Sequence, residues 1–161
     1  MIKVLIADDE AILCESLRFF LEQDPEISVV GCAYDGEEAV RLCDALDPDV
    51  VLMDIVMPGG DGITATRIIK QRFERIKVLI LTTFHDDERL AQALRFGADG
   101  YLLKDVTPAD LCMAVKGLLR GIGVLSRPGF DLAAKSFRSA AAETVAGEGE
   151  RVQLTERELA I

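Results

Sequence analysis

Five short apolar runs that favour β-strand recur along the chain, and a stretch with helical character follows each of them. The runs are continuous rather than alternating, as expected for strands that are covered on both faces. A chain that alternates strand and helix in this way folds as an α/β domain, with a parallel sheet between two layers of helices. The five runs are Lys3–Ala7, Ile27–Ala33, Val50–Met53, Lys77–Leu81 and Gly100–Leu103.

Connection rules restrict the order of the strands in such a sheet. Crossovers between parallel strands are right-handed, and a sheet with helices on both faces is wound in two directions. The commonest solution for five strands is the order 2-1-3-4-5, which is the flavodoxin-like doubly wound fold. We therefore predict a five-stranded parallel sheet in which the first and third strands are neighbours and the winding reverses between them.

Capping residues and apolar spacing predict where the helices lie. Asp35 and Glu38 form a capping-box pattern that opens the second helix, and Thr107 followed by Pro108 is typical of a helix start. Both patterns come shortly after a predicted strand, as an α/β fold requires. Two sets of apolar residues have helical spacing: Leu13, Leu17, Phe20 and Leu21, and then Leu111, Val115, Leu118 and Ile122.

The alternating pattern covers about the first three quarters of the chain and then weakens. We assign residues 1–122 to one domain, and residues 123–150 to a short helix and a linker of small and polar residues. Thr155 and Glu158 form another capping-box pattern, but the sequence stops within two turns of it. Residues 151–161 are therefore interpreted as the start of a second, truncated domain.

The charge of the chain excludes several functions. It has 28 acidic and 18 basic residues, a net charge of −10, and residues 1–123 and 124–161 are each acidic on balance. Affinity for the phosphate backbone of nucleic acids requires a basic surface, so we do not expect this chain to bind DNA by itself. Apolar runs stay well short of the roughly 20 residues that cross a bilayer, so no membrane contact is expected.

The cysteine pattern indicates a reducing compartment. A domain of this size buries enough surface to be stable without disulfides. The cysteines form no CxxC pair and lie in apolar stretches, which is typical of small buried side chains rather than of zinc ligands. We therefore expect a cytoplasmic protein. The four residues are Cys14, Cys32, Cys43 and Cys112.

Acidic side chains follow two strands that are predicted to be neighbours. Asp8 and Asp9 come after the first strand, and Asp54 comes after the third. Ligands of open α/β sheets bind at this edge, where the winding reverses. Three crowded carboxylates would repel one another unless a cation lay among them, and oxygen ligands favour Mg²⁺ or Mn²⁺. Asp9 could alternatively act as the N-cap of the first helix, whereas Asp54 precedes a turn-rich loop and has no obvious capping role.

A hydroxyl and an ammonium group are predicted at the same edge of the sheet. Thr82 follows the fourth strand and Lys104 follows the fifth. Either residue alone would be an ordinary loop hydroxyl or surface lysine. Together with a carboxylate nucleophile and a divalent cation, they are the groups that phosphoryl transfer to an aspartate requires, because the transferred group spreads charge over three oxygens.

These positions closely resemble the receiver domain of two-component response regulators. The resemblance depends on the run Asp8-Asp9-Glu10, on Asp54 in the sequence DIVMPGGDG, on Thr82, and on Lys104 in GYLLKD. It covers residues 2 to about 122. We see no departure at the five chief positions.

The resemblance implies that Asp54 accepts a phosphoryl group from the histidine of a sensor kinase. Asp9, Asp54 and the backbone carbonyl of Val56 would hold Mg²⁺, and Asp8 would reach the ion through water. Lys104 would pair with the phosphoryl oxygens. Such a domain is a phosphoacceptor switch that assists its own phosphorylation and dephosphorylation, rather than an enzyme acting on an external substrate.

The resemblance also implies two switch residues. Thr82 would swing toward the phosphoryl group, and Tyr101 matches the aromatic residue that turns inward when that happens. A half-buried structural tyrosine at the start of a strand is an equally good interpretation of Tyr101. Asp105 replaces the proline that many receivers have after the lysine, which leaves open whether the peptide bond from Lys104 to Asp105 is cis.

The end of the sequence narrows the subfamily. Leu154 to Glu158 resemble the first helix of a LuxR-type helix-turn-helix output domain, and the LLKD sequence that ends at Asp105 is also typical of that group. By this resemblance the whole protein would be a transcription regulator. It would form a homodimer on phosphorylation, through either the face of helix 4, strand 5 and helix 5 or the face of helices 1 and 5. It would bind DNA only through the missing output domain.

Three other classes compete with this interpretation. A metal-dependent hydrolase would need a general base, and the single histidine, His85, lies in a predicted loop beside two acids. A phosphorylation-independent interaction module would keep the fold without needing all five positions. A flavin or nucleotide carrier is disfavoured because no GxGxxG or P-loop sequence follows a strand.

Overall fold

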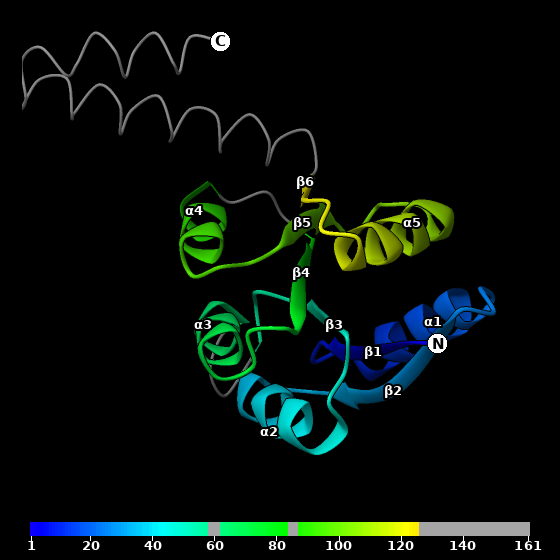
Figure 1. Ribbon diagram of the computed structural model, residues 1–161, viewed down its shortest axis with the longest axis horizontal. Helices are drawn as coiled ribbons and strands as arrows, with labels where there is room; N and C mark the ends of the chain where they lie inside the picture. The colour runs from blue at the N-terminus through cyan, green and yellow to red at the C-terminus, as the bar shows by residue number, and fades with distance from the viewer. Residues whose placement is uncertain (58–61, 84–86, 126–161) are drawn as a thin grey trace, which may run out of the picture.

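Strands and helices alternate along the described part of the chain, which comprises residues 1–57, 62–83 and 87–125 of a computed structural model (Figure 1). Each of the five predicted strands is present within one residue of its expected bounds. The strands are β1 (Ile2–Ala7), β2 (Ile27–Ala33), β3 (Val50–Met53), β4 (Lys77–Thr82), β5 (Gly100–Leu103) and β6 (Val124–Leu125). The helices are α1 (Ala11–Glu22), α2 (Gly36–Leu46), α3 (Gly62–Arg72), α4 (Asp87–Arg95) and α5 (Pro108–Leu119).

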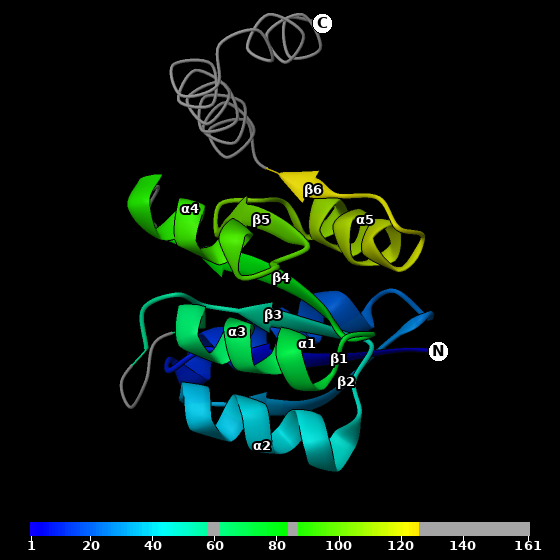
Figure 2. The same ribbon diagram turned by 60° about the vertical axis from the view of Figure 1, so that its left-hand side comes forward.

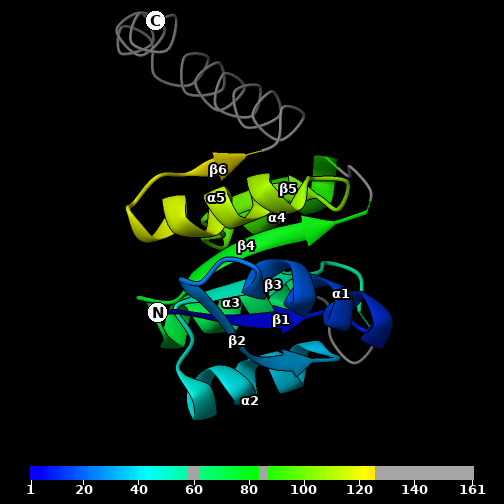
Figure 3. The same ribbon diagram turned by 90° about the vertical axis from the view of Figure 1, so that its right-hand side faces the viewer.

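The sheet is parallel throughout its described part and has the order β2-β1-β3-β4-β5-β6 (Figure 3). The predicted order of the first five strands is confirmed. The sixth strand, β6, was not predicted, and it lies where we expected the short helix and linker to begin. It pairs with β5 through Gly100 and Tyr101. A strand of two residues is too short to show a periodic pattern in the sequence. Its position is set by its pairing with β5, the neighbouring strand. The rest of that segment and residues 151–161 lie outside the described residues.

Two layers of helices cover the sheet, as predicted. Helices α1 and α5 lie on one face, and α2, α3 and α4 lie on the other (Figures 1 and 2). Alternate strand residues enter the two cores, because successive side chains point to opposite faces of a sheet. In β1, for example, Val4 and Ile6 pack under α1 and α5, while Leu5 and Ala7 pack under the other three helices.

Both predicted helix starts are confirmed by their hydrogen bonds. A carboxylate oxygen of Asp35 accepts a hydrogen bond from the backbone N–H of Glu38 at 2.8 Å, and the Glu38 carboxylate accepts one from the N–H of Tyr34 at 2.9 Å. The Thr107 hydroxyl accepts a hydrogen bond from the N–H of Asp110 at 3.2 Å, with Pro108 as the first helical residue. These caps fix where α2 and α5 begin, relative to the strands that precede them.

One residue in each of the two predicted apolar sets, in α1 and in α5, is more exposed than the helical spacing predicts. Ile122 is not part of α5 and is 57% exposed. The helix ends earlier because Gly121 adopts a left-handed conformation, and the N–H groups of Gly121 and Ile122 donate to the carbonyls of Leu118 and Gly117. In α1 the spacing is correct, but Phe20 is 43% exposed, whereas Leu21 is fully buried.

The described cysteines are all free thiols. Cys14 and Cys43 are buried as expected, while Cys32 and Cys112 are only half-buried. Burial raises the pKa of the Cys43 thiol to about 12, so this group is unreactive at neutral pH. No helix within the described ranges is both long and apolar enough to span a bilayer.

Candidate functional site

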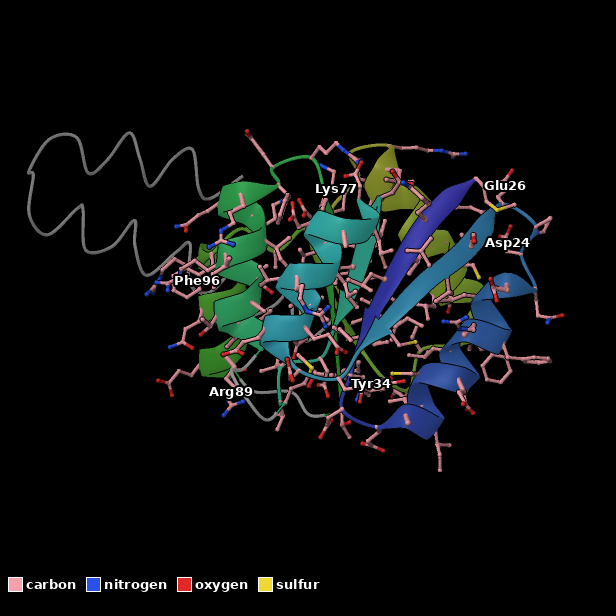
Figure 4. The ribbon with its side chains drawn as sticks, turned by 90° about the horizontal axis from the view of Figure 1, so that it is seen from below. Asp24, Glu26, Tyr34, Lys77, Arg89 and Phe96 are labelled. Carbon is pink, nitrogen blue, oxygen red and sulfur yellow. The ribbon has the colours of Figure 1, made fainter. Side chains whose placement is uncertain are left out.

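The carboxyl ends of the parallel strands bring the predicted site residues to one edge of the sheet. Figure 4 shows the two ends: Lys77 and Glu26 lie near the beginnings of β4 and β2, and Tyr34 lies just after the end of β2, at the opposite edge. Asp8 and Asp54 follow the ends of β1 and β3, which are hydrogen-bonded neighbours. The site is therefore a direct consequence of strand register.

Lys104 forms the central contact of this edge. Its ammonium nitrogen Nζ lies 2.6 Å from Asp8 Oδ2 and 3.2 Å from Asp54 Oδ2. The three side chains are almost removed from solvent, with exposed fractions of 13% for Lys104, 3% for Asp8 and 8% for Asp54. One positive charge thus bridges two buried carboxylates that come from different strands. We call Lys104, Asp8 and Asp54 the charged triad.

The charged triad is not electrically balanced. Burial raises the pKa of the Asp54 carboxyl above its usual value, and the Asp8 charge adds to this, while the Lys104 ammonium opposes it. Burial also works against the charged form of Lys104, but its bonds to Asp8 and Asp54 outweigh burial, and its pKa is raised. Two carboxylates against one ammonium leave a local excess of negative charge. A second cation at this edge would stabilise the ionised form of Asp54.

Asp9 and Glu10 complete a group of acidic side chains beside the triad. Ligand atoms of Asp8, Asp9 and Glu10 lie within 4.8 Å of one another, and Asp9 and Glu10 are exposed. The alternative interpretation of Asp9 as a helix N-cap is wrong. Glu10 occupies that position and makes no side-chain cap, and its own N–H donates a hydrogen bond to a carboxylate oxygen of Asp8 at 2.9 Å. Asp9 is exposed, so its carboxylate is accessible to a divalent cation such as Mg²⁺, which prefers oxygen ligands.

The backbone on the other side of the site lies beside the Asp54 carboxylate. The N–H of Val56 donates to Asp54 Oδ1 at 3.3 Å, and the Val56 side chain is 58% exposed. The N–H of Asp54 itself donates to the carbonyl of Ala7 at 2.9 Å, which ties the segment after β3 to the end of β1. Val56 is thus close enough in the chain for its backbone to take part in the same site.

Thr82 and Tyr101 lie on the two strands next to the triad. Thr82 is the last residue of β4, rather than the first residue after it, and it is buried. Its carbonyl accepts a hydrogen bond from the N–H of Lys104 at 2.7 Å, so the backbones of these two site residues are joined directly. Tyr101 is fully buried in the core under α3 and α4, so the interpretation as a half-buried tyrosine is wrong.

The sequence analysis left two points about the surroundings open. The peptide bond between Lys104 and Asp105 is trans, since the described residues include no cis peptide bond. His85, which a hydrolase might have used as a base, lies outside the described residues. So do residues 58–61 of the turn-rich loop after Asp54.

Sequence reasoning missed two residues that support the site. The first is Gly62, which begins α3 and donates its N–H to the carbonyl of Ile55 at 2.9 Å. A Cβ atom at Gly62 would overlap the backbone carbonyl of Asp54, so only glycine allows this close approach. The second is Cys14, whose thiol donates to the backbone carbonyl of Asp8 at 3.4 Å. A glycine among several and an isolated cysteine give no sequence signal for such contacts.

Comparison with known proteins agrees with this geometry. The family model described as the response regulator receiver domain matches residues 4–116, and the chain belongs to this family. It is 43% identical over 121 residues to the transcriptional regulatory protein LiaR of Bacillus subtilis, covering 75% of this chain and 57% of LiaR. It is 35% identical over 155 residues to the nitrate/nitrite response regulator protein NarL of Escherichia coli, covering 96% of this chain and 70% of NarL.

Solved structures of response regulators share the fold of this chain, and one of them belongs to the LuxR family. A LuxR-family two-component response regulator from Aurantimonas sp. superposes with a TM-score of 0.77 at 34% identity, covering 83% of this chain and 96% of that one. The isolated receiver domain of RcsB from Salmonella enterica, solved with a phosphomimetic, gives a TM-score of 0.73 at 32% identity, covering 81% and 97%. The chain is thus a receiver domain of the two-component response regulators. It spans between about half and three quarters of the length of its curated relatives.

The substitution Gly62→Ala tests how closely α3 approaches the backbone of Asp54. The added methyl group must push Asp54 and Ile55 away, because the Ile55 Cα lies only 3.0 Å from its position. We expect a loss of about 2 kcal/mol in the free energy of unfolding, measured by urea denaturation. Gly123→Ala is the matched control, since its Cβ would meet nothing within 4 Å. An equal, small effect of both substitutions would contradict the close approach.

Proposed function

We propose that Asp54 is the phosphoacceptor of a signalling switch and that a sensor histidine kinase donates the phosphoryl group. The observation that carries the proposal is the Lys104 ammonium, held between the buried carboxylates of Asp8 and Asp54. A lysine at this position provides a fixed positive partner for phosphoryl oxygens that arrive at Asp54. The membership of the chain in the receiver family supports the same assignment.

The transfer exchanges one bond to phosphorus for another. A carboxylate oxygen of Asp54 forms the new bond, and the bond from phosphorus to the kinase histidine nitrogen breaks. Although Asp54 is buried, it follows β3 at the edge of the sheet where Asp9 and Val56 are exposed, and we propose that the kinase approaches from this side. The Lys104 ammonium then pairs with the phosphoryl oxygens in place of the ionised Asp54, so its charge stays compensated.

The acidic group beside Asp54 fits a hard divalent cation. We propose that Asp9, Asp54 and the carbonyl of Val56 would hold Mg²⁺, with Asp8 reaching it through water. When bound, the ion would neutralise part of the charge on the phosphoryl group and on the excess carboxylate of the triad. The position of the exposed Asp9 beside Asp8, and of the Val56 backbone beside Asp54, supports this set of ligands.

The conformational response would begin at Thr82 and Tyr101. Phosphorylation adds about −1.5 to −2 charges where acids already crowd. In our proposal the Thr82 hydroxyl moves toward the phosphoryl oxygens and Tyr101 repacks in the space beside it. The direct backbone bond between Thr82 and Lys104 supports a coupled movement of these strand ends.

We propose that phosphorylation of Asp54 promotes dimerisation of the chain through the face formed by α1 and α5. Large apolar side chains are exposed on both helices, including Ile12 at 82% and Phe19 at 63% on α1 and Met113 at 70% on α5, whereas none of those in the described residues lies on α4. An apolar hollow of about 260 Å³ between the helices adds to this surface. Exposed apolar surface of this kind marks an interaction site. The lining of the hollow includes Leu13, Leu17, Phe20, Pro108 and Leu111.

We also propose how the chain is divided into domains. Residues 1–122 would form the receiver, residues 123–150 a short helix and linker, and residues 151–161 the start of a LuxR-type DNA-binding domain. RcsB, which is 28% identical and superposes with a TM-score of 0.74, has been solved as two dimers bound to two parallel DNAs. By analogy, the full-length regulator would bind DNA as a dimer and control transcription.

Acetyl phosphate tests the phosphoacceptor. Incubation with Mg²⁺ should add one phosphoryl group, detected by intact mass, that hydroxylamine removes because it is an acyl phosphate. Chelation of Mg²⁺ and the substitution Asp54→Asn should each abolish the addition, whereas Asp44→Asn, on the exposed side of α2, should not. A phosphoryl group on the Asp54→Asn protein would refute the assignment. A folded wild-type protein that is never phosphorylated would favour the phosphorylation-independent module.

Sedimentation with beryllofluoride and Mg²⁺ tests the dimer face. We expect the wild-type chain to shift from monomer to dimer, and Met113→Glu to weaken that dimer at least tenfold, because it places a charge in an apolar interface. Arg95→Glu, an exposed substitution on α4, is the control and should dimerise normally. The reverse pattern would assign dimerisation to the face of α4, β5 and α5 instead.

A further inference from the structure

A continuous groove runs between α1 and α5 on the surface of the chain. It consists of the apolar hollow of about 260 Å³ and of a second hollow, of about 370 Å³, nearer the end of α1. Phe20 and Pro108 line both hollows, so the two are joined. Along α1 the first hollow is lined from Leu13 to Phe20 and the second from Phe20 to Asp24, so their midpoints are roughly 8 Å apart.

A short amphipathic segment follows β6 in the sequence. Residues 126–139 lie outside the described residues, and within them Phe130, Ala134 and Phe137 have the spacing of one helical face. In a helix the two phenylalanines would be roughly 10 Å apart along that face. This separation is close to the distance between the two hollows, so the segment offers one aromatic ring for each hollow.

The position of β6 brings this segment within reach of the groove. β6 ends at Leu125 and contacts α5, and Val124 packs against the core under α1 and α5 (Figures 1 and 3). From Leu125 to Phe130 an extended chain spans up to about 17 Å, whereas an α-helix is about 10 Å across. The intervening residues are therefore long enough to pass over α5.

Charge complementarity favours the same contact. Residues 11–26, which form α1 and the turn after it, have four acids and one base. Residues 108–120 of α5 and its end have one acid and two bases, so the two walls of the groove together are acidic. Residues 126–139 have three bases and one acid. This basic segment would be attracted to the acidic walls, and the attraction would favour its docking there.

We propose that residues 130–137 form a helix that docks in the groove between α1 and α5 of the same chain, with Phe130 in one hollow and Phe137 in the other. The docked helix covers apolar side chains that are otherwise exposed, such as Phe20 and Met113. Its regulatory consequence rests on the proposed function, because the groove is part of the proposed dimer face. A second copy can bind there only after the segment has left, so docking holds the unphosphorylated chain as a monomer.

Lys104 connects the groove to the charged triad. It lines the first hollow, and its ammonium nitrogen lies 3.2 Å from Asp54 Oδ2. A phosphoryl group on Asp54 gives this ammonium new oxygen partners, and the wall of the first hollow changes as the lysine side chain moves. Phosphorylation thereby weakens the docking and frees the groove for a second copy.

The reactivity of Cys112 tests the docking in the complete chain without Mg²⁺ or beryllofluoride. Cys112 is half-buried and lines the second hollow. Phe137→Asp should raise the rate at which N-ethylmaleimide modifies Cys112 several-fold, measured by peptide mapping, because the segment no longer covers this thiol. Leu132→Asp, on the opposite side of the predicted helix, is the matched control and should leave the rate unchanged. Cys32 is half-buried but lines neither hollow, so its rate should be the same in all three proteins. An equal Cys112 rate in the wild-type and Phe137→Asp proteins overturns the proposal.

A disulfide identifies the occupant of the groove. Ala134→Cys places a thiol between the two phenylalanines, and mild oxidation with diamide should join it to Cys112 within one chain, at a yield that does not depend on protein concentration. Leu132→Cys is the control and should not form this bond. A bond to Cys112 of another chain would overturn the proposal in favour of a second copy, and the absence of any bond to Cys112 would overturn it as well.

The dimer is tested separately from the docking. Phe137→Asp should lower the dissociation constant of the beryllofluoride-induced dimer several-fold, because the segment no longer competes for the groove. Docking without any dimer would support the docking and refute the proposed dimer face. An equal dissociation constant in both proteins would refute the regulatory role of the segment.

Discussion

One ammonium group between two buried carboxylates is the interaction on which the rest of this molecule depends. Lys104, Asp8 and Asp54 come from the ends of three different strands, so their contact exists only if the parallel sheet forms in the observed order. Taking these charges out of water is costly unless they compensate one another. The compensation is incomplete, and this makes the site receptive both to a cation and to a phosphoryl group that can pair with Lys104.

Helix α1 connects the site to the dimer face that we propose. It begins directly after the acidic residues, where Asp8 accepts a hydrogen bond from Glu10. Its inner face carries the buried Cys14, and its outer face presents Ile12 to solvent. A change in the charge at Asp54 and the association state of the α1 and α5 face would both act on this helix. Such coupling is reciprocal, so each would influence the other.

Strand pattern and strand ends made most of the fold and the charged site predictable. Continuous apolar runs identify buried parallel strands, and residues that follow them must share one edge, so the meeting of Asp54 with Lys104 followed from topology. The misses have local causes. The end of α5 depends on the left-handed conformation of Gly121, β6 is too short to have a pattern, and the hydrogen bond from the Cys14 thiol to the Asp8 carbonyl has no signal in the sequence.

A double-substitution cycle in the absence of divalent cations tests the central claim most directly. Lys104→Met leaves Asp8 and Asp54 buried without a counter-charge and should lower the free energy of unfolding by about 3 kcal/mol. Adding Asp54→Asn to that protein should restore stability by about 1 kcal/mol or more, because one of the two repelling charges is removed, whereas Asp54→Asn in the wild-type background should not stabilise as much. If Asp54→Asn changes the free energy of unfolding equally in both backgrounds, the two side chains are not coupled through Lys104 and the account is wrong.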